Sequence, residues 1–469
     1  MKSGDPAEWA REEFGHARLG HALRVRALVR TAAGCAKRPG GKVTSVFKRS
    51  ADRESAYRLV ENESVDAEAV MTAAHQAAAR RCAGARFVYV PVDKTSLNVT
   101  DLAEKKGFGM IGTSSAKAQG LNVLTALAIT PDGVPQGIAH QRYWARPRKT
   151  KSSRRVRKTT PLGQRESRLW EGAMADVANT FAAVENGGRP WFQIDREGDV
   201  SGALEWAVTG GHLLTVRAQS NRRLAEAGKR RTYVRDLLEA LPALGVRQVH
   251  KSARPGQSER IADVEVRAAT VQLDIPIDES HKRRRVLSMN VVLVSEPSPP
   301  DGEEPLDWLL FTTAPVDSFE HAVSVVTGYS QRWRIEEFHR AWKSGTCNVE
   351  DSQTRSSTHL IRWAVVLASV AVRVIRLAYL ARAQPTASAA LEFSDDEILA
   401  IKMVVAPRDP PTDPTLGTVV GWLASIGGYP GLKSAGGPPG FIVLSRGLEY
   451  IQPMVAALVG MRALKRDQC

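Results

Sequence analysis

The stretch from Tyr329 to Lys343 limits the possible folds of this chain more than any other part of it. It contains no proline or glycine and consists largely of helix-forming residues, which predicts one continuous helix. At about 100° per residue, four of its polar side chains would lie within an arc of about 60°, and these are Tyr329, Arg332, Glu336 and Lys343. Ile335, Phe338 and Trp342 would form an apolar stripe on the other side. The pattern predicts a helix that is anchored in a core and presents a carboxylate beside cations.

The polar face of this helix has two interpretations. Surface ion pairs of Glu336 with Arg332 and with Arg340 would explain the pattern without any function. A phosphate-binding face beside a metal-binding carboxylate is the other interpretation, and the pattern alone favours the ion pairs. The choice depends on the acidic and basic residues elsewhere in the chain.

The charge of the chain indicates the class of its partner. The 469 residues are enough for two or three domains. Lys and Arg outnumber Asp and Glu by 65 to 50, which gives a net charge of +15 and favours nucleic acid or an anionic membrane as the partner. No apolar run approaches the roughly 20 residues of a membrane-spanning helix, and the N-terminus has no apolar signal core. We therefore expect nucleic acid as the partner, no membrane partner, and a cytoplasmic, nucleoid-associated protein.

The cysteines predict neither disulfides nor a zinc site. They are far apart and show no CxxC or Cys/His ligand spacing, and they are Cys35, Cys82, Cys347 and Cys469. Reduced thiols are expected.

The N-terminal residues, from 9 to about 80, have helical periodicity with interleaved arginines and a break at Pro39 to Gly41. A single arginine here can belong to a solvated helix face, whereas the clustering favours contact with a DNA backbone. A second basic stretch, residues 146–168, has the densest positive charge in the chain. It can be a solvated linker or a DNA-phosphate contact.

Short apolar runs predict a mixed α/β sheet, and two of them end on an aspartate. The run from Arg86 to Val92 is followed by Asp93, and the run from Trp191 to Ile194 is followed by Asp195. Strand-end aspartates also occur for turn reasons alone. The remaining predictions are a hairpin over 123–140, a helix over 169–184, a strand from Leu213 into Arg217, strands at 261–266, 270–277, 286–294 and 308–312, and a helix over 361–382.

Three acids from distant segments are therefore candidates for one site: Asp93, Asp195 and Glu336. Hard divalent cations such as Mg²⁺ prefer oxygen ligands. Two such ions about 4 Å apart can hold both the attacking and the leaving oxygen of an in-line displacement at phosphorus. The acids could supply these ligands if the two strands are neighbours and the helix packs beside them.

The acids and the helix together resemble the pattern of a known family. The chain resembles the bacterial cut-and-paste transposases of the DDE class, in particular the insertion-sequence transposases of the transposon Tn-five type, which carry a Y-R-E-K signature. That spacing is filled here by Tyr329, Arg332, Glu336 and Lys343. The resemblance covers nearly the whole chain and is strongest in Asp93–Leu97, Asp195–Glu197, Pro305–Leu309 and Tyr329–Lys343.

The resemblance implies a three-part architecture. Residues 1–68 would form a helical domain that binds transposon ends. Residues 69–346 would form an RNase H-like catalytic core with a β-rich insertion at about 220–300. Residues 347–469 would form a helical region that dimerises. The implied partners are double-stranded DNA, both transposon ends and target, and a second copy of the chain.

The resemblance also implies the chemistry. Asp93, Asp195 and Glu336 would be the catalytic residues and would bind two Mg²⁺ ions, for which Mn²⁺ would substitute. One strand would be nicked by hydrolysis, a hairpin would form and reopen, and the 3′-hydroxyl ends would join target DNA.

Further side chains are implied as DNA contacts. Tyr329, Arg332 and Lys343 would clamp phosphate, and Trp308 would stack a flipped base. Trp333 can be either a DNA contact or a core residue. The other matching positions are Arg217 and, in the N-terminal module, Lys37, Arg38, Thr44, Glu54 and Arg58.

Two other functional classes stay open. One is a domesticated or inhibitory relative that binds DNA without catalysis, and the other is a general metal-dependent nuclease on the same fold. Inhibitory members of the family lack the N-terminal module, but residues 9–60 and all three acids are present here, which favours the enzyme. A general nuclease would need neither the Y-R-E-K face nor Trp308.

Overall fold

The chain is an α/β protein with a mixed sheet of ten strands. The computed structural model describes residues 5–101, 105–112, 118–146, 168–225, 232–251, 259–276, 283–431 and 438–466. The order in the sheet is β2-β3-β1-β5-β6-β10-β9-β8-β7, with β4 paired to β3. The basic stretch 146–168 lies outside the described residues, apart from its two end residues, and Cys469 lies outside them as well.

The chain divides into two compact units, which are described separately. The helix-rich unit consists of Met1–Ala83, Lys94–Lys149 and Glu336–Cys469, and the strand-rich unit consists of Gly84–Asp93 and Thr150–Ile335. Strand β1 (Phe87–Asn98) contributes residues to both. The expected division into three functional domains stays a prediction.

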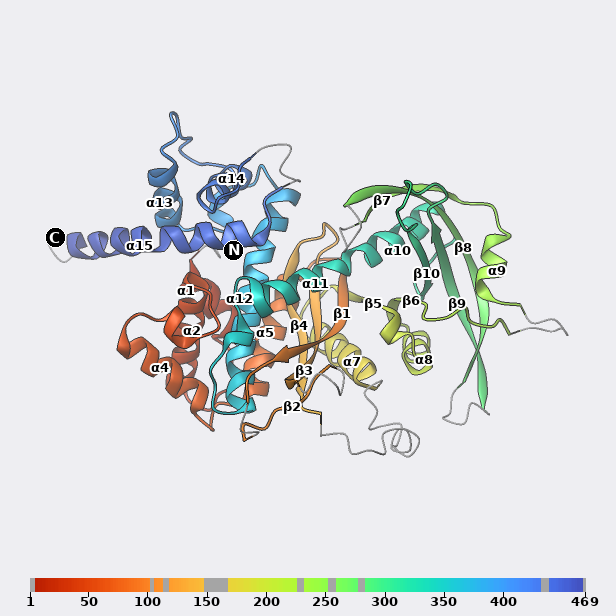
Figure 1. Cartoon of the computed structure of the whole chain (residues 1–469), viewed down its shortest axis with the longest axis horizontal. Helices are drawn as coiled ribbons and strands as arrows, with labels where there is room; N and C mark the ends of the chain where they lie inside the picture. The colour runs from red at the N-terminus through yellow and green to blue at the C-terminus, as the bar shows by residue number, and fades with distance from the viewer. Residues whose placement is uncertain are drawn as a thin grey trace. The chain divides into compact units, whose positions relative to one another are not determined.

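The helix-rich unit begins with the helices expected from the N-terminal periodicity. They are α1 (Pro6–Phe14), α2 (Ala22–Lys37), α3 (Val43–Val46), α4 (Ser50–Glu61) and α5 (Ala67–Arg81) (Figure 1). Asp5 and Asp66 cap the N-termini of α1 and α5 by accepting hydrogen bonds from backbone amides. The break at Pro39 to Gly41 separates α2 from α3, as predicted. Cys35 and Cys82 are buried free thiols in this region.

A hairpin and a long helix form the centre of this unit. Strands β3 (Gln119–Ile129) and β4 (Pro135–Trp144) pair antiparallel, as predicted but over longer spans, and β2 (Gly109–Met110) pairs with β3. Helices α5 and α12 (Ser357–Ala383) pack against β4.

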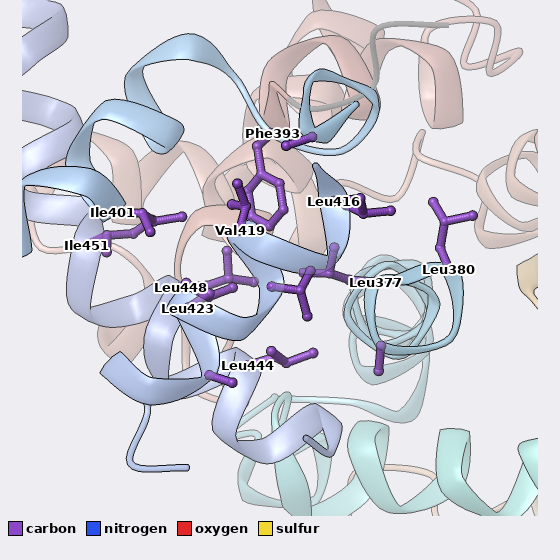
Figure 2. Close-up of a cluster of buried hydrophobic side chains, with 14 of the residues drawn as sticks. Leu377, Leu380, Phe393, Ile401, Leu416, Val419, Leu423, Leu444, Leu448 and Ile451 are labelled. Atoms are coloured by element: carbon purple, nitrogen blue, oxygen red, sulfur yellow. The ribbon is translucent and has the colours of Figure 1, made fainter. Parts of the chain in front are cut away.

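The C-terminal helices are η5 (Ala389–Leu391), α13 (Asp395–Val405), α14 (Leu416–Ile426) and α15 (Phe441–Arg466). Figure 2 shows their apolar core, in which Leu377 of α12 lies among Leu416 and Leu423 of α14 and Leu444 of α15. A single helical subdomain therefore covers the end of α12.

Two of the described helices are long and apolar enough to cross a membrane by length and composition, α12 and the Phe441–Arg462 part of α15. Arginines interrupt the apolar residues of α12, so the sequence shows no uninterrupted apolar run of membrane-spanning length there. Of its apolar window 78% is buried, as in a core helix, against 22% in α15. Helix α15 therefore presents apolar surface, at Tyr450, Val459, Met461 and Leu464.

The strand-rich unit has a parallel part and an antiparallel part. The first half of β1 pairs in parallel with β5 (Arg189–Ile194), and β5 pairs in parallel with β6 (Leu213–Arg217). Antiparallel strands continue the sheet from β6 in the order β10 (Asp307–Thr312), β9 (Arg284–Ser295), β8 (Arg260–Pro276) and β7 (Gly245–Lys251) (Figure 1). The helical elements of this unit are α7 (Arg168–Ala182), η2 (Arg196–Gly198), α8 (Ser201–Thr209), α9 (Val234–Glu239) and α10 (Phe319–Gln331).

Two predicted strand boundaries are wrong. Strand β1 does not end at Val92 but continues to Asn98, because residues 93–96 are half-buried polar positions that an apolar run cannot reveal. The runs 261–266 and 270–277 are one strand, β8, whose pairing with β9 is unbroken through Arg267. Arg267 is tolerated there because it ion-pairs with Glu265 and donates to the backbone oxygen of Leu241.

The prediction of one continuous helix from Tyr329 to Lys343 is also wrong. Helix α10 ends at Gln331, α11 spans Trp333–Arg340, and a π-helical turn, η3, spans Ala341–Gly345. At the junction, backbone amides donate to the carbonyl three residues earlier instead of four, from Arg332 N to Tyr329 O and from Ile335 N to Arg332 O. The apolar stripe itself is confirmed, because Ile335, Phe338 and Trp342 have no exposed surface.

Candidate functional site

The two candidate aspartates follow the last paired residues of neighbouring parallel strands. Val92 of β1 pairs with Ile194 of β5, and the next residues along the chain are Asp93 and Asp195. Adjacent strands lie about 4.8 Å apart, so both carboxylates leave the sheet at the same level. Both residues are half-buried, and the buried strand residues before them fix their backbones.

A tight turn follows Asp195. Its Oδ1 accepts a hydrogen bond from the backbone N of Glu197 at 2.9 Å and caps the short helix η2. Gly198 closes the turn against the strand, since a Cβ at this position would lie 2.1 Å from Cγ2 of Ile194. The turn therefore directs the chain away from the sheet immediately after the carboxylate.

A basic and aromatic hollow of about 400 Å³ lies in the same unit. It is lined by residues of β6, β7, β10, α10 and the junction after α10, among them Arg196, Arg217, His250, Lys251, Asp307, Trp308, Tyr329, Arg332 and Trp333. The excess of cations over carboxylates suits an anionic ligand. The aromatic rings offer a stacking surface for a base.

Tyr329 connects this hollow to Asp195. Its side chain is 5% exposed, and its ring meets the ring of Trp308 edge-on at a centroid distance of 5.0 Å. Burial raises the pKa of Tyr329, and the negative charge of Asp195 raises it further. The positive charges of Arg332 and Arg217 act in the opposite direction and are smaller effects than burial. The phenol therefore remains neutral and can donate a hydrogen bond to a bound phosphate beside Asp195.

Arg217 is fixed by the backbone. Its Nη2 donates to the carbonyl oxygen of Asp307 at 2.9 Å. The carboxylate of Asp307 is in turn held by both terminal nitrogens of Arg235, at 3.0 and 2.9 Å. These bonds hold the guanidinium of Arg217 at the wall of the hollow, where a phosphate could reach it.

Arg332, between α10 and α11, and Trp333, the first residue of α11, line the same hollow. Trp333 is half-buried, in contrast to the fully buried Trp342. Trp333 is therefore not a fully buried core residue, and its role as a DNA contact stays a prediction.

Glu336 and Lys343 belong to the helix-rich unit. Lys343 Nζ lies 3.4 Å from Thr95 Oγ1 and 3.5 Å from Glu350 Oε1. Glu350 also accepts from the backbone N of Asn98 at 2.8 Å. Lys343 is therefore anchored beside the second half of β1, which begins directly after Asp93.

The aspartates fit a divalent cation in donor chemistry, because two carboxylate groups at one level of a sheet are the oxygen ligands such an ion prefers. Among the described residues no group of three or more His, Cys, Asp or Glu side chains could hold a metal ion. Asp93 and Asp195 belong to the strand-rich unit and Glu336 to the other. The complete triad stays a prediction, and the strand register brings together two of its three members.

The N-terminal candidates lie at the surface of the helices. Lys37 ends α2, Arg38 is its C-cap, and Thr44 lies in α3. Glu54 and Arg58 of α4 form an exposed ion pair at 2.5 Å. Their exposure is compatible with either of the interpretations given for this module, a solvated face or DNA contact.

Sequence reasoning missed several residues near the site. Arg196, His250 and Lys251 line the hollow, and the buried carboxylate of Asp199, four residues after Asp195, forms an ion pair with Arg222. The sequence signal that could have identified Arg196 and Asp199 is the dense acidic and basic run from Asp195 to Asp199, which contains both. A scan of the chain against models of known protein families finds no match.

Proposed function

We propose that this protein is a metal-dependent DNA transposase that binds the ends of its element, nicks them, passes through a hairpin intermediate and joins the 3′-hydroxyl ends to target DNA. The observation that carries the proposal is the register of β1 and β5, which sets Asp93 and Asp195 side by side in the unit that contains a basic and aromatic hollow. This combination suits the cleavage of a phosphodiester whose flanking base is held by stacking.

The sheet order supports an RNase H-like core. A β3–β4 hairpin lies on one side of β1, and the parallel strands β5 and β6 lie on the other. The strands β7 to β9, which fall within residues 220–300, would then form the β-rich insertion, and β10 would follow it before α10. In such a core the two aspartates would be metal ligands and Glu336 the third.

Four residues of the hollow have a specific role in the proposal. Arg217 and Arg332 neutralise phosphate, and the neutral phenol of Tyr329 donates to a phosphate oxygen. Trp308 stacks on a base turned out of the duplex, which offsets part of the few kcal/mol that unstacking costs. Bound Mg²⁺ would supply activation of the attacking oxygen and stabilisation of the leaving oxygen.

The C-terminal helices support self-association. Helix α15 exposes Tyr450 by 62%, Val459 by 52%, Met461 by 53% and Leu464 by 64%. Exposed apolar side chains on a long helix are compatible with an interface to a second copy of the chain. A homodimer would hold two DNA ends at once.

The proposal is tested with DNA from both sides of the gene, which should contain the terminal repeats. The full-length protein should bind this DNA, seen as a shift of its gel mobility, and should nick it in Mg²⁺. Glu336→Ala and Asp195→Asn should shift it equally well and fail to nick. Glu320→Ala removes an exposed glutamate of α10 and serves as the matched control, which should keep both activities.

Unchanged nicking by Glu336→Ala or Asp195→Asn would refute the catalytic assignment. DNA binding without nicking by the unaltered protein would favour the non-catalytic relative. Cleavage that shows no preference for the flanking DNA would favour the general nuclease.

A further inference from the structure

Asp93 and Asp195 are held in different ways by the chain. Asp93 lies inside β1, which continues for five residues to Asn98, so the strand fixes its backbone on both sides. Strand β5 ends at Ile194, so the sheet holds Asp195 on one side only. An aspartate at a strand end needs another constraint if its carboxylate is to stay in place.

The buried ion pair of Asp199 and Arg222 supplies this constraint. Asp199 Oδ1 accepts from Arg222 Nη2 at 2.6 Å and from Nε at 3.1 Å. Arg222 Nη2 also donates to the carbonyl oxygen of Asp199 at 3.1 Å, and Asp199 Oδ2 accepts from the backbone N of Gln219 at 2.8 Å. The Asp199 side chain is 1% exposed, and both of its oxygens accept hydrogen bonds from the protein.

The partners of Asp199 belong to the segment that follows β6. Gln219 and Arg222 come directly after this strand, whose Val216 pairs with Ile194. The Arg222 guanidinium also lies 5.7 Å from the ring centre of Phe311 on β10, which has no exposed surface. Arg222 is thereby anchored to the sheet.

The result is a short loop fixed at both ends. The β5–β6 pairing fixes Ile194, the ion pair fixes Asp199, and Asp195 lies between them together with η2. Neither Asp199 nor Arg222 lines the hollow, so neither touches a ligand bound there.

We propose that Asp199 and Arg222 are positioning residues, and that their ion pair sets the affinity of the Asp93–Asp195 site for divalent cations by fixing the carboxylate of Asp195. The proposal rests on the proposed function, in which Asp195 is a metal ligand. Residues that orient metal ligands typically change metal affinity by about 10- to 100-fold when they are altered.

The test measures Mn²⁺ binding to the full-length protein by electron paramagnetic resonance, in which free Mn²⁺ gives the signal. Asp199→Asn keeps the shape of the side chain and loses its charge. It should weaken Mn²⁺ binding about 10- to 100-fold. Arg222→Lys keeps the charge but loses the forked geometry, and should give a smaller loss in the same direction.

Glu296→Gln is the matched control. Glu296 is a buried carboxylate in the same unit that accepts from Arg260 and from the backbone N of Leu306, with 3% of its side chain exposed. Glu296→Gln should lower the melting temperature about as much as Asp199→Asn and leave Mn²⁺ affinity unchanged. A purely structural role of Asp199 would give both variants the same Mn²⁺ affinity.

Nicking supplies a second measurement. Raising Mg²⁺ should restore the nicking rate of Asp199→Asn towards that of the unaltered protein, whereas Asp195→Asn should not recover. If Asp195→Asn weakens Mn²⁺ binding and Asp199→Asn behaves like Glu296→Gln, the positioning role is refuted and the proposed function stands. If Asp195→Asn leaves Mn²⁺ binding unchanged, both are refuted.

Discussion

The histidine at position 75 should make this protein less stable in mild acid. His75 of α5 is 6% exposed, and its Nε2 accepts a hydrogen bond from the backbone N of Gln141 at 3.1 Å. Its ring centre lies 5.5 Å from that of His140. Burial, with a smaller contribution from His140, lowers the pKa of His75 to about 3. A proton on Nε2 would also abolish the bond from Gln141.

The sign and size of the effect follow from linkage. In the unfolded chain the pKa of His75 is about 6.5, so below this pH the unfolded state binds a proton that the folded state does not. Stability is therefore complete above about pH 6.5 and declines as pH falls towards 3. Below about pH 6.5 the loss is about 1.4 kcal/mol per pH unit, so the loss between pH 7 and pH 5 is about 2 kcal/mol. This figure hardly depends on the folded pKa, because that value lies well below pH 5.

The assay compares urea unfolding at pH 7 and pH 5 for the unaltered protein and His75→Gln, in which the glutamine oxygen can accept the bond from Gln141. The unaltered protein should lose about 2 kcal/mol more than the variant. His321→Gln removes an exposed histidine and should follow the unaltered protein. An equal loss of unfolding free energy between pH 7 and pH 5 in the unaltered protein and His75→Gln would refute the reasoning. An imidazole NMR titration that places the pKa of His75 near 6.5 would refute it as well.

Other regions of the structure give further predictions. Gly41→Ala should destabilise the protein by roughly 1–3 kcal/mol, because a Cβ there would lie 1.8 Å from the backbone oxygen of Asn348. Gly172→Ala is the control, because Gly172 of helix α7 has open space around it. This control variant should be neutral or stabilising in thermal melts. Tyr329→Phe keeps the ring contact with Trp308 and should melt normally, but it should nick DNA more slowly because its phosphate donor is lost; an unchanged rate would contradict the role of the hydroxyl. The logarithm of DNA affinity should fall steeply with the logarithm of salt concentration, and a flat plot would exclude multiple phosphate contacts.

The strands around the site could be predicted from the sequence where the buried strand residues are also a continuous apolar run. The run before Asp195 and the run into Arg217 are strands β5 and β6 within a residue or two of the expected bounds. The parallel register of these strands could not be predicted, because it depends on pairing between segments about a hundred residues apart in the case of β1 and β5. The second half of β1 was missed because its residues after Asp93 are polar and half-buried.

The helix from Tyr329 to Lys343 shows a different limit. A helical wheel assumes a constant angle per residue, whereas the chain tightens at Arg332 and widens to a π turn at Ala341. The indole of Trp342 donates to the carbonyl oxygen of Ala364 at 3.0 Å, a bond that fixes this turn against α12. No proline or glycine within the stretch marks these changes, so the sequence alone carries no sign of them.

The run Asp195-Arg196-Glu197-Gly198-Asp199 shows how much of a site lies in its supporting contacts. Sequence reasoning singled out Asp195 because an acid follows an apolar run, but the structure gives a physical reason for most of the run. The amide of Glu197 fixes Asp195, Gly198 leaves room for Ile194, and Asp199 binds Arg222. These reasons depend on segments that meet only in the fold. A carboxylate held in this way loses little conformational freedom when it binds a ligand, which is why its supporting residues should matter for affinity even though they lie outside the hollow.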